Sequence, residues 1–362
     1  MAEKDENKIL VIITICIILI FIGFNGCITQ EDNENNEKLI TNGIFKICKG
    51  SEPVFSPDGT KILFINNFIE EDPNEIYLIN TNGKGLKKIL KTNLDDRTFS
   101  INPNNSKILY HKYDMNHGYS EIWLVNVDGT NNHLLKKGYH ASFSPNGNQI
   151  LYAVEEIIGN YKLEDNMLRI MDLNGSNDKL IMKTHSPNLI WRPTFFPDGQ
   201  RILFSIDDRS AGFERSYNNN SSINDTFKPG LWVIDINGNN SKYLTNYYGS
   251  SFRSPRTKVI VSKNGEKILY YGGTHAHSQL LFVYDLNEMN EIQVKDPSYL
   301  YGADISRDSK NITWADDESL WISNINGTEI KPLARGYNPH FSPIDDIIVF
   351  EDGKVIYSCR YK

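Results

Sequence analysis

A short motif recurs seven times along this chain of 362 residues and constrains its fold more than any other feature. Each copy has two apolar runs that flank a turn rich in Pro, Asp, Asn and Gly, which is typical of a β-hairpin. Successive copies begin 36 to 66 residues apart, and a unit that recurs at about this period indicates a propeller or a solenoid. The copies are FSPDGTKILF (55–64), INPNNSKILY (101–110), FSPNGNQILY (143–152), FFPDGQRILF (195–204), VSKNGEKILY (261–270), ISRDSKNITW (305–314) and FSPIDDIIVF (341–350).

Each hairpin is followed by further apolar runs that complete a unit of four strands. Four antiparallel strands per repeat form one blade of a β-propeller, and the β-branched and aromatic content favours strands over helices. The third runs end near Asn or Asp and are EIYLIN (75–80), EIWLVN (121–126), MLRIMD (167–172), LWVID (231–235), LLFVYD (280–285) and LWISN (320–324). The fourth runs are KKIL (87–90), HLLKK (133–137), KLIM (179–182), KYLT (242–245) and IKPL (330–333).

The seventh repeat has no fourth run of its own after GKVIYSCRYK (353–362). A matching run lies at the other end of the chain, where IFKICKG (44–50) precedes the first hairpin as IKPLARG (330–336) precedes the last. We therefore expect the N-terminal run to pair with the C-terminal strands, which closes the ring and removes an exposed sheet edge. The prediction is an all-β, seven-bladed propeller over residues 44–362; the alternative is six blades and an additional hairpin.

The hairpins resemble the repeats of TolB-type propellers, whose signature is a strand, a Ser-Pro-Asp-Gly turn and an Ile-x-Phe/Tyr strand. The resemblance covers residues 44–362 and implies the propeller fold. It implies no single function, because such blades occur in periplasmic scaffolds, in peptidase gating domains and in some lyases. The sixth repeat matches least well, with Arg307, Asp308 and Ser309 at its turn.

The N-terminus is predicted to carry a targeting signal or membrane anchor. Residues 9–24 form an uncharged apolar run of the kind found in secretory signals, and Gly26 and Cys27 follow it as in a lipobox. Residues 1–27 are thus predicted to be a signal peptide or membrane anchor in which Cys27 is lipidated, with an uncleaved anchor as the alternative. The polar residues 28–43 are expected to form a flexible tether.

Charge and targeting together limit the expected partners. The net charge of −7 and the lack of a basic cluster argue against nucleic acid. We expect a monomeric propeller without a cofactor, held at the extracytoplasmic face of the cell membrane and facing an envelope protein or glycan.

Two cysteines, Cys48 and Cys359, fall on strands of the closing blade. A disulfide between them would be stable outside the cell and would staple the ring. The register argues against a simple pair, because it places Cys48 opposite Val355, four residues from Cys359. Both possibilities stay open at this point.

The repeat alignment predicts which residues ring the mouth of the central channel on the side of the longer loops. Three residues before the apolar signature residue stand Glu52, Thr98, His140, Arg192, Lys258, Gly302 and Asn338, and one residue further out stand Ser51, Arg97, Tyr139, Trp191, Thr257, Tyr301 and Tyr337. Aromatic side chains with Arg and Lys suit recognition of sugars, peptides or anions. The candidate binding residues are Arg97, Tyr139, His140, Trp191, Arg192, Lys258, Tyr301 and Tyr337; the alternative is that the aromatics only pack between blades.

Catalytic motifs are few. The sequence contains no Gly-x-Ser-x-Gly elbow and no nucleotide-binding loop, so no catalytic residue is assigned. His275 and His277 are weak metal candidates on the loop side, together with His111, His117 and His140. A binding or scaffold module is the main functional hypothesis. The alternative is a lyase or hydrolase that acts on an anionic saccharide at the channel mouth.

Overall fold

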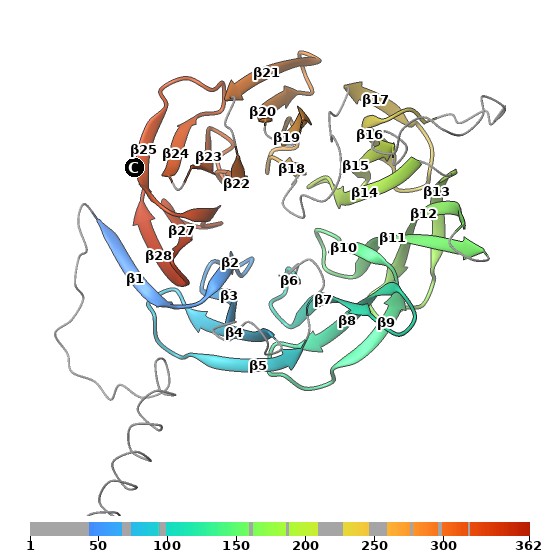
Figure 1. Cartoon of the computed structure of the whole chain (residues 1–362), viewed down its shortest axis with the longest axis horizontal. Coiled ribbons are helices and arrows are strands. Elements are labelled where there is room, and N and C mark those ends of the chain that lie inside the picture. Colours follow the sequence, from blue (N-terminus) through green and yellow to red (C-terminus); the bar gives the residue numbers. More distant parts are fainter. Residues whose placement is uncertain are drawn as a thin grey trace, which may run out of the picture.

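The computed structural model describes residues 43–66, 74–92, 94, 99–158, 162–185, 188–208, 227–245, 259–275, 278–295, 299–317 and 319–362. Within these residues 28 strands form seven four-stranded antiparallel sheets, arranged as blades around a central axis (Figure 1). The predicted seven-bladed propeller is confirmed. In the part of the chain so described, no helix is long and apolar enough to cross a membrane; residues 9–24 and Cys27 lie outside that part.

The first six blades each use four consecutive strands, with the first strand innermost. Blades one to three are β2 (Ser51–Phe55), β3 (Lys61–Asn66), β4 (Asn74–Asn80) and β5 (Lys87–Thr92); β6 (Phe99–Ile101), β7 (Lys107–Asp114), β8 (Tyr119–Asn126) and β9 (His133–Lys137); β10 (Tyr139–Phe143), β11 (Gln149–Ile158), β12 (Lys162–Asp172) and β13 (Lys179–His185). Blades four to six are β14 (Asn188–Phe195), β15 (Arg201–Asp208), β16 (Gly230–Asp235) and β17 (Lys242–Thr245); β18 (Val259–Val261), β19 (Lys267–His275), β20 (Ser278–Asp285) and β21 (Asn290–Lys295); β22 (Leu300–Ile305), β23 (Asn311–Asp316), β24 (Ser319–Asn324) and β25 (Lys331–Arg335).

The seventh blade combines both ends of the described chain. Its strands are β26 (Tyr337–Phe341), β27 (Ile347–Asp352), β28 (Val355–Arg360) and β1 (Ile44–Lys49), in the order β26-β27-β28-β1. β1 runs antiparallel to β28 and is the outer strand of the sheet.

Cys48 and Cys359 lie in this blade and form no disulfide. A register shift between Lys46 and Cys48 places Cys48 opposite Ile356, one residue from the position expected from sequence. Cys359 is three residues beyond Ile356, and side chains an odd number of residues apart on a strand point to opposite faces. Cys48 therefore packs toward blade one and Cys359 toward blade six. The disulfide considered above is thus inconsistent with the structure.

The signature serine explains why the hairpin sequence recurs. Ser56 donates from Oγ to Asp58 Oδ1 (2.6 Å) and accepts from the backbone N–H of Lys61 (2.9 Å). Ser144 repeats the pattern with Asn146 and Gln149, and Ser262 and Ser306 do so in their own blades. A buried hydroxyl with both roles satisfied stabilises the turn without leaving an unpaired polar group.

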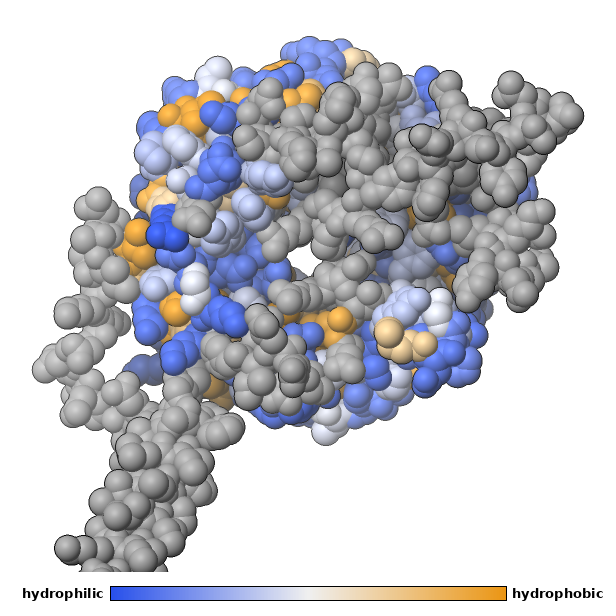
Figure 2. Space-filling view, in the orientation of Figure 1, coloured by the Kyte–Doolittle hydropathy of each residue, from blue (hydrophilic) through white to orange (hydrophobic). Residues whose placement is uncertain are grey.

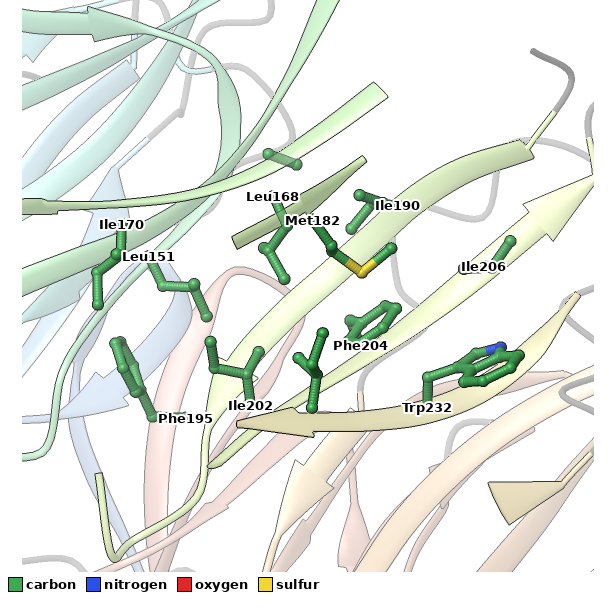
Figure 3. Packing of buried hydrophobic residues seen from close by; sticks show 12 residues of the cluster. Leu151, Leu168, Ile170, Met182, Ile190, Phe195, Ile202, Phe204, Ile206 and Trp232 are labelled. Atoms are coloured by element: carbon green, nitrogen blue, oxygen red, sulfur yellow. The ribbon is translucent and has the colours of Figure 1, made fainter. Parts of the chain in front are cut away.

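Apolar side chains fill the space between adjacent blades. Figure 3 shows one such layer, in which Leu151, Leu168 and Met182 of blade three meet Ile190 and Phe204 of blade four. The second strand of a blade contacts apolar layers on both faces, so Ile62, Leu63, Phe64 and Ile65 are all at most 1% exposed. This explains why the signature strands are continuous apolar runs instead of alternating ones.

Candidate functional site

The predicted ring residues occupy a β-bulge near the start of the innermost strand. In each blade where this position is described, the pairing with the second strand shifts across it. The residue in the bulge has a positive φ: Glu52 (52°), His140 (51°), Arg192 (46°), Gly302 (108°) and Asn338 (49°). Thr98 and Lys258, the equivalent residues of blades two and five, lie outside the described residues.

Left-handed backbone at these positions is costly for most residues other than glycine, with Asn and Asp the more tolerant ones. The cost is about 1–2 kcal/mol for a residue with a Cβ atom. Blade six has Gly302 at this position, so glycine is sufficient to form the bulge, whereas blades three and four have His140 and Arg192 there. Strained residues of this kind cluster at functional sites, where the surrounding structure holds a side chain in a required place.

Two aromatic side chains, Tyr139 and Trp191, precede these bulge residues and contact the ring of His140. β10 packs beside β14, and the ring centroids of His140 and Trp191 are 4.1 Å apart in an edge-to-face arrangement. Tyr139 contacts both, at 5.1 Å from His140 and 6.4 Å from Trp191. Buried Asn166 of β12 orients this group, because it donates to the Tyr139 hydroxyl and accepts from the Ile190 N–H at 2.6 Å.

The surroundings of His140 favour its neutral form. Burial holds the pKa of His140 well below its usual 6.5, and the positive charge of Arg192 lowers it further. Nε2 of His140 is buried and has no hydrogen-bond partner among the described residues. Nε2 of His111 accepts the N–H of Ala141 at 2.9 Å, so its ring carries no proton at that nitrogen. The site thus combines a neutral acceptor at His140 with the permanent cation of Arg192.

A cavity of about 170 Å³ adjoins these side chains. Its lining includes His111, His140, Ser142, Arg192 and Thr194, and it reaches Val259 and Ile260 of blade five. In the space-filling view a narrow opening remains at the centre of the ring (Figure 2). The cavity offers the guanidinium of Arg192, the imidazole of His140 and the hydroxyls of Ser142 and Thr194. Tyr139 and Trp191 lie beside His140 and are not part of the lining.

The opposite side of the mouth, at blades seven and one, is acidic. Glu351 of β27 accepts the Glu52 N–H at 2.7 Å through Oε2 and the Asn338 amide at 2.8 Å through Oε1. The same amide of Asn338 donates to Glu52 Oε2 at 3.1 Å. The mouth therefore has a basic side and an acidic side, which lie across the ring from each other in Figure 1.

His111 and Glu351 were missed as ring residues from the sequence, although a signal existed. Both directly follow the aromatic residue of the second strand, at the place that faces the bulge. The seven equivalent residues are Ile65, His111, Ala153, Ser205, Tyr271, Ala315 and Glu351. Aligning this position as well as the inner strand would have identified both.

The remaining candidates divide into two groups. Tyr301 and Tyr337 contact each other edge to face at 5.0 Å, on blades six and seven, so the four predicted aromatics form two pairs instead of one ring. Arg97, Lys258 and His277 lie outside the described residues, as does the side chain of His275. His117 pairs with Asp114 at 2.6 Å on the β7–β8 hairpin. Among the side chains that the structure describes, no three of His, Cys, Asp and Glu gather as metal ligands.

Comparisons with known proteins support the fold. The sequence matches no protein-family model and no curated protein. An oligogalacturonate lyase in complex with manganese superposes with a TM-score of 0.64 at 14% identity, over 88% of this chain and 92% of the other. An oligogalacturonate lyase from Vibrio parahaemolyticus gives 0.61 at 13% identity, over 88% and 93%. TolB from Acinetobacter baumannii gives 0.50 at 14% identity, over 85% and 65%. At these identities the likeness shows that the chain has the TolB-type propeller fold.

Proposed function

We propose that this protein is an extracytoplasmic binding or scaffold module of the cell envelope, tethered to the membrane by its N-terminal segment. Its ligand is an acidic group of an envelope glycan or protein, bound at the loop-side mouth of the channel. The observation that carries the proposal is the pair of left-handed bulges that hold His140 and Arg192 beside one cavity.

The chemistry of the pair fits such a ligand. A guanidinium binds a carboxylate through two parallel hydrogen bonds, and such charge-assisted bonds are stronger than neutral ones. The unpartnered Nε2 of His140 suits a hydroxyl or amide N–H of the same ligand. Trp191 and Tyr139 supply rigid aromatic surface for a sugar ring or an apolar side chain.

A second candidate function is elimination on an acidic saccharide. It is favoured by the neutral, buried imidazole of His140 next to the cation of Arg192. A base that removes the proton α to a carboxylate needs an unprotonated nitrogen, and a neighbouring Arg stabilises the developing enolate. The imidazole of His140 takes that proton, the bond from the β carbon to the departing sugar oxygen breaks, and the oxygen takes a proton from solvent, which leaves a carbon–carbon double bond in the product. Manganese is named with one structural neighbour, but the described residues assemble no metal ligands, so no step is assigned to a metal.

Cross-linking capture from envelope extract tests the proposal. The bait is the full chain, compared with Arg192→Gly, Trp191→Ala and the control Asn105→Gly. Asn105 also has a left-handed backbone (φ 57°), but it lies in the hairpin turn between β6 and β7, on the side of the ring opposite the longer loops. Its replacement therefore changes a left-handed position without altering the loop-side mouth. We expect capture by the natural chain and the control only. Equal capture by all four would refute a binding site at this mouth.

A spectroscopic assay separates the two functions. Acidic oligosaccharides that are bound and then released unchanged support the binding module. The appearance of an unsaturated product, followed by its near-ultraviolet absorbance and abolished in His140→Gly, would instead establish the lyase.

A further inference from the structure

Two consecutive repeats depart from the signature turn in the same way. Lys263 of blade five and Arg307 of blade six stand where every other blade has proline. The prolines are Pro57, Pro103, Pro145, Pro197 and Pro343. Proline at the first central position of such a turn presets its backbone angle. Blades five and six close the same turn without it, since Gly265 N–H and Ser309 N–H bond to the carbonyls of Ser262 and Ser306 at 2.8 and 2.9 Å.

Both cations line one cavity of about 310 Å³. It is formed where the inner strands β18, β22 and β26 end, whereas the bulges with His140 and Arg192 lie near the starts of inner strands. The cavity therefore belongs to the opposite, turn-side mouth of the channel. Val261, Ile305, Phe341 and Pro343 contribute apolar wall to it.

Two cations, Lys263 and Arg307, and one carboxylate, Asp304, line this cavity. Lys263 is exposed and forms no ion pair with any described residue. Arg307 is oriented by blade seven, because it donates to the Ile344 carbonyl and lies 3.8 Å from Asp346. Asp304 is the acidic residue of the lining, and its carboxylate is engaged by the N–H groups of Ile305 and Phe341 at 2.8 and 2.9 Å. His340 Nδ1 is a further 3.5 Å neighbour of the same carboxylate.

An unsatisfied hydroxyl lies in the same turn. Ser309 replaces the usual turn glycine, has a φ of 56° and is 8% exposed, and its Oγ has no hydrogen-bond partner within the described residues. In three other blades a Cβ at this position would meet the proline of the preceding blade at 3.1 to 3.8 Å. The repeat geometry thus places Ser309 against Lys263. Ser309 is not part of the cavity lining, so it marks the departure of this turn from the repeat and is not a ligand contact.

We propose that the turn-side mouth is a second binding site, separate from the His140–Arg192 site, for a small ligand with an anionic group and an apolar group. The anion, a phosphate or a carboxylate, lies between Lys263 and Arg307. The apolar part lies on Val261, Ile305 and Phe341, and the enclosed volume suits a group of about ten heavy atoms.

Ligand-observed NMR on the full chain tests the site with phenyl phosphate and phenylacetate, and with uncharged benzyl alcohol as the matched control. We expect both anions to bind, benzyl alcohol to bind at least about tenfold more weakly, and Lys263→Pro to weaken anion binding about tenfold or more. Lys263→Pro restores the residue of the other blades, so the fold is expected to be retained. Arg307→Gln provides an independent variant with the same expected direction.

The comparison of the two anions identifies whether a phosphate or a carboxylate is preferred. The titrations are repeated in Arg192→Gly, which removes the carboxylate site at the opposite mouth; anion binding that remains in this variant, and that Lys263→Pro then weakens, belongs to the turn-side mouth. The proposal is overturned if neither anion binds, if benzyl alcohol binds as tightly as they do, if Lys263→Pro and Arg307→Gln bind like the natural chain, or if Arg192→Gly abolishes the signal.

Discussion

Replacing Arg192 with glycine separates the contribution of this residue to binding from its contribution to stability. Arg192 has a φ of 46°, which costs about 1–2 kcal/mol for a residue with a Cβ atom. Glycine removes that cost but adds backbone entropy to the unfolded chain, which offsets about 0.5–1 kcal/mol. The two backbone contributions together favour the glycine variant by about 0–1.5 kcal/mol, or up to about 3 °C in Tm for a domain of this size, before the lost interactions of the Arg192 side chain are counted against it.

Ligand binding should change in the opposite direction. Loss of a charge-assisted, bidentate hydrogen-bond pair typically costs about 1.5–3 kcal/mol, which is at least tenfold in affinity. A variant that is no less stable and yet binds poorly is the expected signature of a residue retained for function.

Calorimetric unfolding and capture of the envelope ligand are the two measurements, and Asn105→Gly is the control. Asn105 has a similar left-handed backbone, so the control should change stability by less than about 1 kcal/mol and keep full binding. Arg192→Ala keeps the strain, so it should not gain stability, and it should lose binding. If the free energy of unfolding of Arg192→Gly is more than about 1 kcal/mol lower than that of the natural chain, Arg192 is retained for packing and the prediction is wrong.

Three further predictions concern the blade junction, pH and the thiols. Gly138→Ala would place a Cβ 2.8 Å from both the Ala153 carbonyl oxygen and Tyr152 Cδ2 at a φ of 147°. It should lower the free energy of unfolding by about 2–4 kcal/mol, and an unchanged denaturation midpoint would contradict this. Because the pKa of His140 lies below its unfolded value of 6.5, the unfolded chain binds a proton first as pH falls. The contribution of His140 to the free energy of unfolding is therefore complete above pH 6.5 and should fall by up to about 1.4 kcal/mol per pH unit below it. If the stability of the natural chain changes with pH no more than that of His140→Gly, this prediction is wrong. Burial raises the pKa of Cys359 to about 11, and Cys48 is buried as well. Iodoacetamide should therefore label both thiols only after unfolding. An intact mass lower by two hydrogens than that of the reduced chain would show a disulfide instead.

The blade architecture was predictable because its determinants are local. Ser56, Asp58 and Lys61 bond to one another within six residues, so the hairpin can be recognised in any one repeat and its recurrence then indicates the ring. The positions of Tyr139, His140, Trp191 and Arg192 at one mouth also followed, since equivalent residues of a propeller occupy equivalent places around the axis.

Features that depend on one irregular residue were not predictable in the same way. The shift between Lys46 and Cys48 moved the register of the closing strand by one residue. The bulges that turn His140 and Arg192 inward appear only as backbone angles. Glu351 lies 299 residues from its partner Glu52, and no pattern along the chain relates the two until the ring is assembled.

Departures from the repeat are the most informative positions in such a chain. Serine, proline and glycine at the turn and glycine at the bulge are sufficient to form these features of a blade, as Ser56, Pro57, Gly59 and Gly302 show. Bulky residues occupy the bulge in several blades, and in two of them the side chains contribute to the fold: Asn338 donates to Glu52 and to Glu351. His140 and Arg192 differ, because they line a cavity and His140 Nε2 has no hydrogen-bond partner among the described residues. At the turn side Lys263 and Arg307 replace proline on adjacent blades and line a second cavity. Polar side chains that the repeat does not require, placed beside a cavity, are the reason to seek ligands at both ends of the channel.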